Sequence, residues 1–145
     1  MIYNLFQSLW IYDSDAPQPD PNGILEFLTG ELASAERAGQ RAWIIGHVPI
    51  VECQSNYYDQ IVRRFHSTIA GQFFGHSHKD QFEITYSDYN HPSSLNAVSV
   101  ALIGPELTPT SGNPVFKLYD VDCDTYEIMD VRVYFTNIPD PSFQN

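Results

Sequence analysis

Apolar positions in the first forty residues predict a strand, a loop and a helix. Residues 4–12 form an apolar-rich run that predicts a strand, and a proline-rich loop follows it. Apolar residues three and four apart then predict a helix, with Asp20 as N-cap, Pro21 at the first helical position and Gly39 at the C-cap. The apolar face of this helix is made of Leu25, Leu28, Leu32 and Ala35.

Two continuous apolar runs separated by a second helix predict parallel strands. The run "AWIIGH", residues 42–47, is typical of a strand buried on both faces, and residues 68–78 repeat this character. Between them, residues 56–65 predict a helix with Tyr58, Ile61 and Phe65 on one stripe. The resulting order of strand, helix, strand, helix, strand predicts a βαβ arrangement.

The pattern changes to β-type after residue 80. Residues 81–87 alternate strictly between polar and apolar side chains, and residues 96–103 form a further apolar strand. Two more strands are predicted at residues 115–122 and 125–135, joined by a hairpin connection. Their alternation slips near Met129–Asp130, which predicts a β-bulge. We therefore expect one α/β (α+β) domain, with a βαβ first half and a mainly antiparallel second half.

Composition excludes several classes of function. The 145 residues suit one globular core, and no apolar run approaches the ~20 residues that a membrane helix needs. With seven basic residues and a net charge of −11, we expect no binding to nucleic acid, because phosphate contacts need clustered Lys and Arg. The first residues show no signal-peptide pattern.

Histidines supply the candidate chemistry. Two predicted strands end in the same way, with Gly46-His47 and Gly75-His76, and His78 follows in a His-x-His pair. Strand ends are where α/β sheets place their functional groups, and three neutral imidazoles can hold a zinc ion with one open position. The alternative is that these are surface imidazoles in turns, since a lone Gly-His is not specific. Asp80, the nearby carboxylate, is interpreted as a loop residue.

The other histidines, the serines and the two cysteines give weaker evidence of a functional site. His66 at a helix end and His91 in a turn are interpreted as structural. The chain contains no G-x-S-x-G, no glycine-rich phosphate loop, and no evident base for Cys53. Cys53 and Cys123 could pair or remain free thiols, and their spacing does not decide this.

Several segments resemble one known family in order along the chain. "IIGHVP", "NYYDQIV", "FFGHSHKDQFEI" and "NPVFKLYDVD" are similar to segments of acid sphingomyelinase and the acid sphingomyelinase-like phosphodiesterases, which are calcineurin-like metallophosphoesterases. The resemblance extends from about residue 4 to about residue 122. It implies part of a β-sandwich flanked by helices, and a binuclear zinc centre to which His47, His76 and His78 contribute ligands.

The sequence departs from the family at the other ligands. It contains no Asp-x-His, Gly-Asp or Gly-Asn-His, the motifs that precede this region in the family. The resemblance therefore implies a single incomplete domain over residues 1–145, the C-terminal half of a catalytic domain, with no catalytic general acid in this chain. It also implies that Cys53 pairs with a cysteine upstream.

The resemblance implies a metal-dependent phosphodiester hydrolase acting on a substrate such as sphingomyelin or a nucleotide phosphodiester. We expect the chain by itself to be inactive and to self-associate through an exposed apolar sheet edge. Peripheral contact with a lipid surface and a secreted or lysosomal location are implied by the family alone. Two alternatives remain open: a non-catalytic relative with one zinc on three histidines, and a chain completed by another polypeptide.

Overall fold

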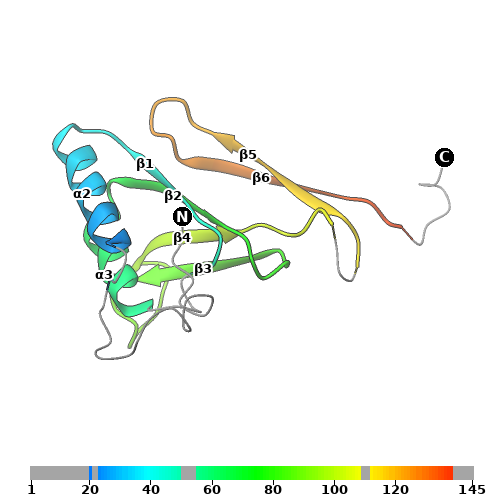
Figure 1. The fold of residues 1–145 in the computed structure, drawn as a ribbon, viewed down its shortest axis with the longest axis horizontal. Helices are drawn as coiled ribbons and strands as arrows, with labels where there is room; N and C mark the ends of the chain where they lie inside the picture. Colours follow the sequence, from blue (N-terminus) through cyan, green and yellow to red (C-terminus); the bar gives the residue numbers. More distant parts are fainter. Residues whose placement is uncertain (1–19, 21–22, 50–54, 109–111, 139–145) are drawn as a thin grey trace.

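Two helices and six strands make up the part of the chain that the structure describes. The structure, a computed structural model, describes Asp20 and residues 23–49, 55–108 and 112–138, so the strand predicted at residues 4–12, Pro21 and Cys53 lie outside it. The elements follow the predicted order (Figure 1): α2 (Ile24–Arg37), β1 (Ala42–Ile45), α3 (Ser55–Phe65), β2 (Ile69–Phe74), β3 (Gln81–Tyr86), β4 (Ala97–Ile103), β5 (Val115–Val121) and β6 (Ile128–Phe135).

Helix α2 begins later than predicted, and it ends one residue before the prediction, since its C-cap is Ala38 and the predicted C-cap, Gly39, follows it. Its N-cap is Gly23, in the left-handed region with φ 68°, so the prediction of Asp20 as N-cap was wrong. Asp20 still contributes, because its carboxylate accepts a hydrogen bond of 2.8 Å from the backbone N–H of Glu26 in the first turn. At the other end, Gly39 adopts φ 65°, and the N–H groups of Gly39 and Gln40 bond back to the last turn as a Schellman motif.

The main sheet has four strands in the order β1-β2-β4-β3. Strands β1 and β2 are parallel, which confirms the βαβ unit. Strand β4 pairs in parallel with β2 and antiparallel with β3. The prediction of a mainly antiparallel second half is confirmed by the β3–β4 and β5–β6 pairs, while β4 also joins the first half by pairing in parallel with β2. The carboxyl ends of three parallel strands, β1, β2 and β4, therefore lie side by side at one end of the sheet.

Strands β1 and β2 differ in burial because of their places in the sheet. The central strand β2 is buried on both faces, as predicted. The strand β1 lies at the sheet edge among the described residues, and the prediction that it is buried on both faces was wrong. Ile45 is 72% exposed and Trp43 is 45% exposed, while Ile44 faces the core.

Both helices pack on one face of the sheet. Tyr58 of α3 meets Phe74 edge to face, and the predicted stripe of α3 lies against the core together with Val62, which is fully buried. The core cluster joins the two helices to β1, β2 and β4 through Leu32, Ile44, Val62, Phe65, Ile69, Phe74, Ala101 and Ile103. Neither described helix is long and apolar enough to cross a membrane.

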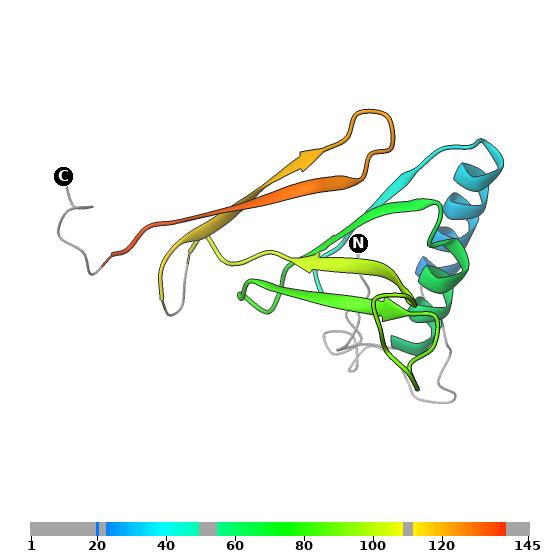
Figure 2. The same ribbon diagram turned by 180° about the vertical axis from the view of Figure 1, so that it is seen from behind.

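The β5–β6 hairpin lies over the opposite face. Phe73 contacts Tyr119 with ring centroids 5.1 Å apart, and side chains adjacent along a strand point to opposite faces. A Cβ added at Gly71 would lie 3.1 Å from the ring of Phe73 and 3.4 Å from Ile128 of β6, so the hairpin lies directly over this position. Figure 2 shows the hairpin and the helices on different sides of β2. The predicted bulge is present, because Asp120 pairs with Asp130 while Val121 pairs with Ile128.

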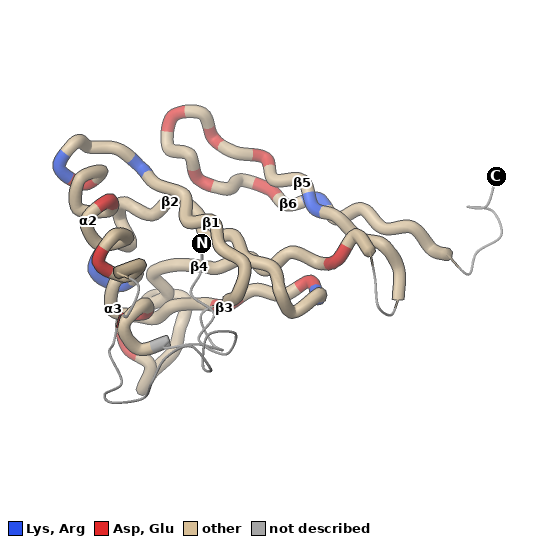
Figure 3. Tube along the Cα trace, in the orientation of Figure 1, with Lys and Arg blue, Asp and Glu red and all other residues tan. Residues whose placement is uncertain are grey.

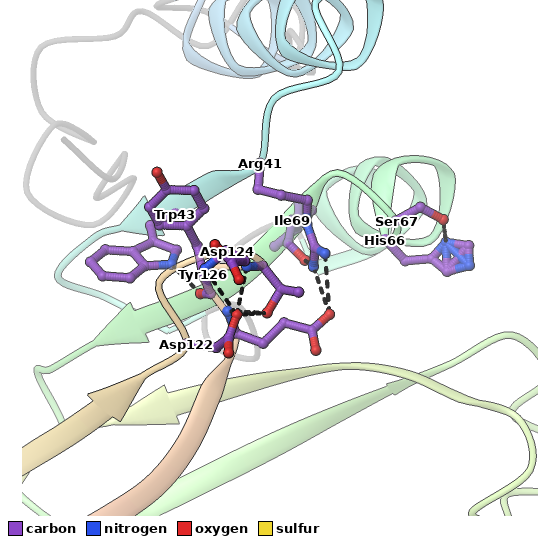
Figure 4. Close-up of polar contacts among 10 residues, drawn as sticks. Arg41, Trp43, His66, Ser67, Ile69, Asp122, Asp124 and Tyr126 are labelled. Carbon is purple, nitrogen blue, oxygen red and sulfur yellow. Dashed lines mark hydrogen bonds and ion pairs between the residues drawn. The ribbon is translucent and has the colours of Figure 1, made fainter.

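The tip of the hairpin is fastened to the start of β1. The indole N–H of Trp43 donates to the backbone carbonyl of Tyr126 at 2.9 Å, and Arg41 forms an ion pair with Glu127 at 3.1 Å (Figure 4). The tip itself is held by Asp122, whose carboxylate accepts from the backbone N–H groups of Asp124 and Thr125. These bonds fix the second sheet relative to the first.

Charges are distributed unevenly over the fold. Figure 3 shows acidic residues gathered toward the tip of the β5–β6 hairpin and on the helices, with the basic residues dispersed. Among the described residues, five basic side chains form ion pairs with acidic side chains: Arg41, Arg63, Arg64, Lys117 and Arg132.

Candidate metal centre

The carboxyl ends of three adjacent parallel strands lie next to one another at one end of the main sheet. Each strand is followed at once by a glycine: Gly46 after β1, Gly75 after β2 and Gly104 after β4. Backbone bonds continue the pairing past the strand ends, since Gly75 N–H donates to the carbonyl of His47 and Gly104 N–H to that of Phe74. The groups that follow the glycines are thereby brought to one place.

His47 and His76 lie against each other at this edge. Their imidazole rings meet edge to face, with centroids 5.2 Å apart and an interplanar angle of 84°. Both side chains are exposed at the surface. The sequence predicted that these two histidines share one site, and the parallel pairing of β1 with β2 brings them together.

The His-x-His segment is a tight turn in an unusual backbone conformation. His76 and His78 both have positive φ values, 72° and 61°. Non-glycine residues in this region are uncommon and carry strain, and they occur preferentially at functional sites. The left-handed conformation falls on the histidines themselves and not on the glycine that precedes them.

His78 is directed toward a carboxylate from the third strand end. Its Nδ1 atom lies 2.5 Å from Oε2 of Glu106. The side chain of Glu106 is 11% exposed, and that of His78 is 53% exposed. Sequence reasoning missed Glu106, because β4 was assigned to the antiparallel half. The available signal was "ALIGPE", an apolar strand that ends in glycine like the two histidine-bearing strands.

A buried lysine supports the same turn from β5. Lys117 forms an ion pair with Asp80, two residues after His78, and its ammonium group also donates to the carbonyl of Ile103 at 3.4 Å. The Lys117 side chain is only 6% exposed. Asp80, interpreted from the sequence as a loop residue, thus fastens the end of the turn to the hairpin.

The imidazoles of His47, His76 and His78 and the carboxylate of Glu106 suit one side of a metal site. Imidazole nitrogens are good ligands for zinc, and a carboxylate behind a ligating histidine is the usual second partner of such a ring. Within the described ranges, no three His, Cys, Asp or Glu side chains gather closely enough to hold a metal ion. The three predicted ligands therefore comprise one adjacent pair, His47 and His76, and a third ring turned to Glu106.

The other candidates lie elsewhere. His66 contacts Ser67 at 3.4 Å, and His91 lies 3.1 Å from Asp88 in an exposed turn. Cys123 is a free, exposed thiol at the hairpin tip. A cavity of about 410 Å³ between the main sheet and β6 is lined by residues that include Ile69, Gly71, Leu102 and Val131, and by none of the three predicted ligands.

Comparison with known proteins finds relatives over most of the chain. It is 39% identical over 128 residues to sphingomyelin phosphodiesterase from Bos taurus and 38% identical to that from Homo sapiens, covering 82% of this chain and 20% of each relative. It is 30% identical over 151 residues to human acid sphingomyelinase-like phosphodiesterase 3b, covering 89% of this chain and 32% of that protein. No protein-family model matches the chain. The chain thus spans about a fifth of the length of the sphingomyelin phosphodiesterases that it matches.

Proposed function

Since the chain belongs by homology to the sphingomyelin phosphodiesterase family, we propose that it is the metal-binding part of a hydrolase of phosphodiesters. The observation that carries this proposal is the meeting of His47 and His76 at adjacent parallel strand ends. The names of the relatives favour a phospholipid substrate such as sphingomyelin. A secreted or lysosomal location is proposed on the same basis.

His47, His76 and His78 would hold the metal, which we propose to be zinc. A binuclear metal site of this type clamps phosphoryl oxygens and supplies a hydroxide nucleophile when loaded. The role of this chain would be to present neutral imidazole nitrogens from the carboxyl ends of the sheet strands. Because the rings must be neutral to bind, metal affinity falls as the medium becomes acidic.

We propose that these residues form only part of the site. Three imidazoles supply fewer ligands than two metal ions need, and carboxylates that bridge two metals are absent from the described cluster. Hydrolysis would then require further ligands from outside the described residues, and the described cluster by itself would bind metal without turning over substrate.

Zinc binding tests the proposal directly. The full chain is dialysed against zinc, its metal content is measured by mass spectrometry, and His47→Ala and His76→Ala are compared with His91→Ala. His91 lies in an exposed turn with Asp88 and serves as the matched control. We expect zinc in the wild type and in His91→Ala, and its loss from the two site variants. A wild type without zinc overturns the proposal.

The alternative is a non-catalytic relative that keeps one zinc for structure or binding. The absence of a three-ligand cluster among the described residues favours its non-catalytic part and speaks against one zinc held by all three histidines. Hydrolysis of bis(p-nitrophenyl) phosphate and of sphingomyelin vesicles separates the two. A longer protein containing this chain should hydrolyse one of them under the first proposal, and neither under the alternative.

A further inference from the structure

Glu106 reaches the candidate metal centre only because β4 is parallel to β2. Strand β4 delivers Gly104, Pro105 and Glu106 to the same sheet edge as His47 and His76. Its position there is fixed on both sides, since Gly104 N–H donates to the carbonyl of Phe74 and the Glu106 carbonyl accepts from Val115 N–H. The carboxylate is thus carried by backbone that the sheet and the hairpin hold.

The contact with His78 favours one of the two neutral ring tautomers. His78 Nδ1 lies within hydrogen-bond distance of Glu106 Oε2, at 2.5 Å, and a carboxylate oxygen in this position accepts from the tautomer that carries its proton on Nδ1. In a neutral ring, Nε2 then holds the lone pair. The nearly buried acceptor and the half-exposed ring place this lone pair on the side away from Glu106.

The backbone that carries this ring is also held in place. His78 has a φ of 61°, and two residues later Asp80 is tied to the buried ammonium group of Lys117. The backbone that carries His78 is therefore fastened on one side and the ring on the other.

We propose that Glu106 is a positioning residue for His78, which it holds as the Nδ1–H tautomer so that Nε2 is presented to a zinc ion. The metal half of this inference rests on the proposed function. The tautomer half concerns only the chain's own residues and holds with or without metal. Carboxylates behind ligating histidines raise ligand basicity and fix ring orientation in this way.

Zinc affinity is the first test. Isothermal titration with zinc compares the full-length wild type with Glu106→Ala, Glu106→Gln and the exposed control Glu31→Gln. Loss of a carboxylate behind a ligating histidine typically weakens binding about 10–100-fold, which is the expectation for Glu106→Ala. Glu106→Gln keeps an acceptor oxygen without the charge, so its zinc affinity should lie between those of Glu106→Ala and the wild type. The affinity of Glu31→Gln should match the wild type. Equal affinity of Glu106→Ala and the wild type overturns the inference.

The tautomer of His78 is the second test, and it separates this inference from the proposed function. Nitrogen-15 NMR of the metal-free chain near neutral pH reports which ring nitrogen is protonated. We expect Nδ1–H in the wild type and a shift toward Nε2–H in Glu106→Ala, with Glu106→Gln as the near-isosteric variant if Ala perturbs folding. If the wild type binds no zinc but its His78 ring is protonated on Nδ1, the proposed function is overturned and the role of Glu106 stands. An Nε2–H ring in the wild type overturns that role.

Discussion

The indole N–H of Trp43 on β1 donates a hydrogen bond of 2.9 Å to the backbone carbonyl of Tyr126 at the tip of the β5–β6 hairpin. The two residues are 83 positions apart, and the bond joins the edge of the main sheet to the second sheet (Figure 4). The hairpin tip therefore depends on a side chain from the first half of the chain.

Trp43→Phe should loosen the hairpin tip without unfolding the main sheet. The substitution removes the donor and leaves an exposed carbonyl, a loss of about 0.5–1.5 kcal/mol. Hydrogen exchange should quicken in the N–H groups of residues 124–127, with the amides of β2 as the internal control. Unchanged exchange at the tip would show that the Arg41–Glu127 ion pair is sufficient to hold it.

A buried polar chain should couple α3 to the centre of the sheet. The Tyr58 hydroxyl donates to Gln72 Oε1 at 2.8 Å, and Gln72 Nε2 donates to the Ser99 hydroxyl at 2.7 Å. Gln72 has no exposed surface, and burial raises the pKa of Tyr58. Gln72→Leu leaves two half-buried partners without their hydrogen bonds, and we expect a loss of about 1–3 kcal/mol in the free energy of unfolding.

Urea denaturation of Tyr58→Phe, Gln72→Leu and the double variant measures this coupling. Contacting residues in one network usually show a coupling of about 0.5–3 kcal/mol. Additive losses in the cycle would mean that the two side chains act independently.

Asp80→Asn should destabilise the protein more than its exposed position suggests. The substitution removes the charged partner of Lys117, whose side chain is 6% exposed, and leaves the ammonium group with the carbonyl of Ile103. We expect a loss of roughly 1–3 kcal/mol in the free energy of unfolding by urea. Asp124→Asn, at the exposed hairpin tip, is the matched control. Equal stability of the two variants would contradict the supporting role of the Asp80–Lys117 pair.

Acid should weaken the hairpin tip through Asp122. Its pKa is lowered by hydrogen bonds from the backbone N–H and hydroxyl of Thr125 and the backbone N–H of Asp124. A lowered carboxyl pKa contributes stability that is fully present above the unfolded value of about 4 and is lost as pH falls through the folded value.

Asp122→Asn should consequently lower the thermal midpoint at pH 7 and flatten its decline below about pH 4, the unfolded carboxyl pKa. Scanning calorimetry at several pH values measures both effects. A variant with the same acid slope as the wild type would exclude Asp122 as a source of the pH dependence.

The β1 edge should cause self-association. Among the described residues β1 has no outer neighbour, and Ile45 is 72% exposed beside the half-exposed Trp43. Unpaired apolar edges promote pairing between chains, and an inserted lysine opposes it. Size-exclusion chromatography should show a concentration-dependent oligomer that Ile45→Lys shifts toward monomer. A wild type that stays monomeric at high concentration would contradict this expectation.

Local pattern was sufficient to predict the helices and strands that the structure describes. The helical stripe of α3, the buried run of β2 and the bulge at Met129–Asp130 were all predicted, because side-chain periodicity is a property of a few neighbouring residues. The positions of His47 and His76 at strand ends followed in the same way. The start of α2 was wrong because two plausible caps, Asp20 and Gly23, lie within one turn of each other.

The sequence by itself determined which segments become helices and strands, and which imidazoles end the first two strands. Only the tertiary structure decided that β4 lies beside β2 in parallel, that β1 is an edge, and that Glu106 therefore lies behind His78. Strand order depends on pairing between residues about thirty positions apart, such as Gln72 with Ala101. Periodicity does not encode this pairing, because the same alternating strand can join either edge of a sheet in either direction.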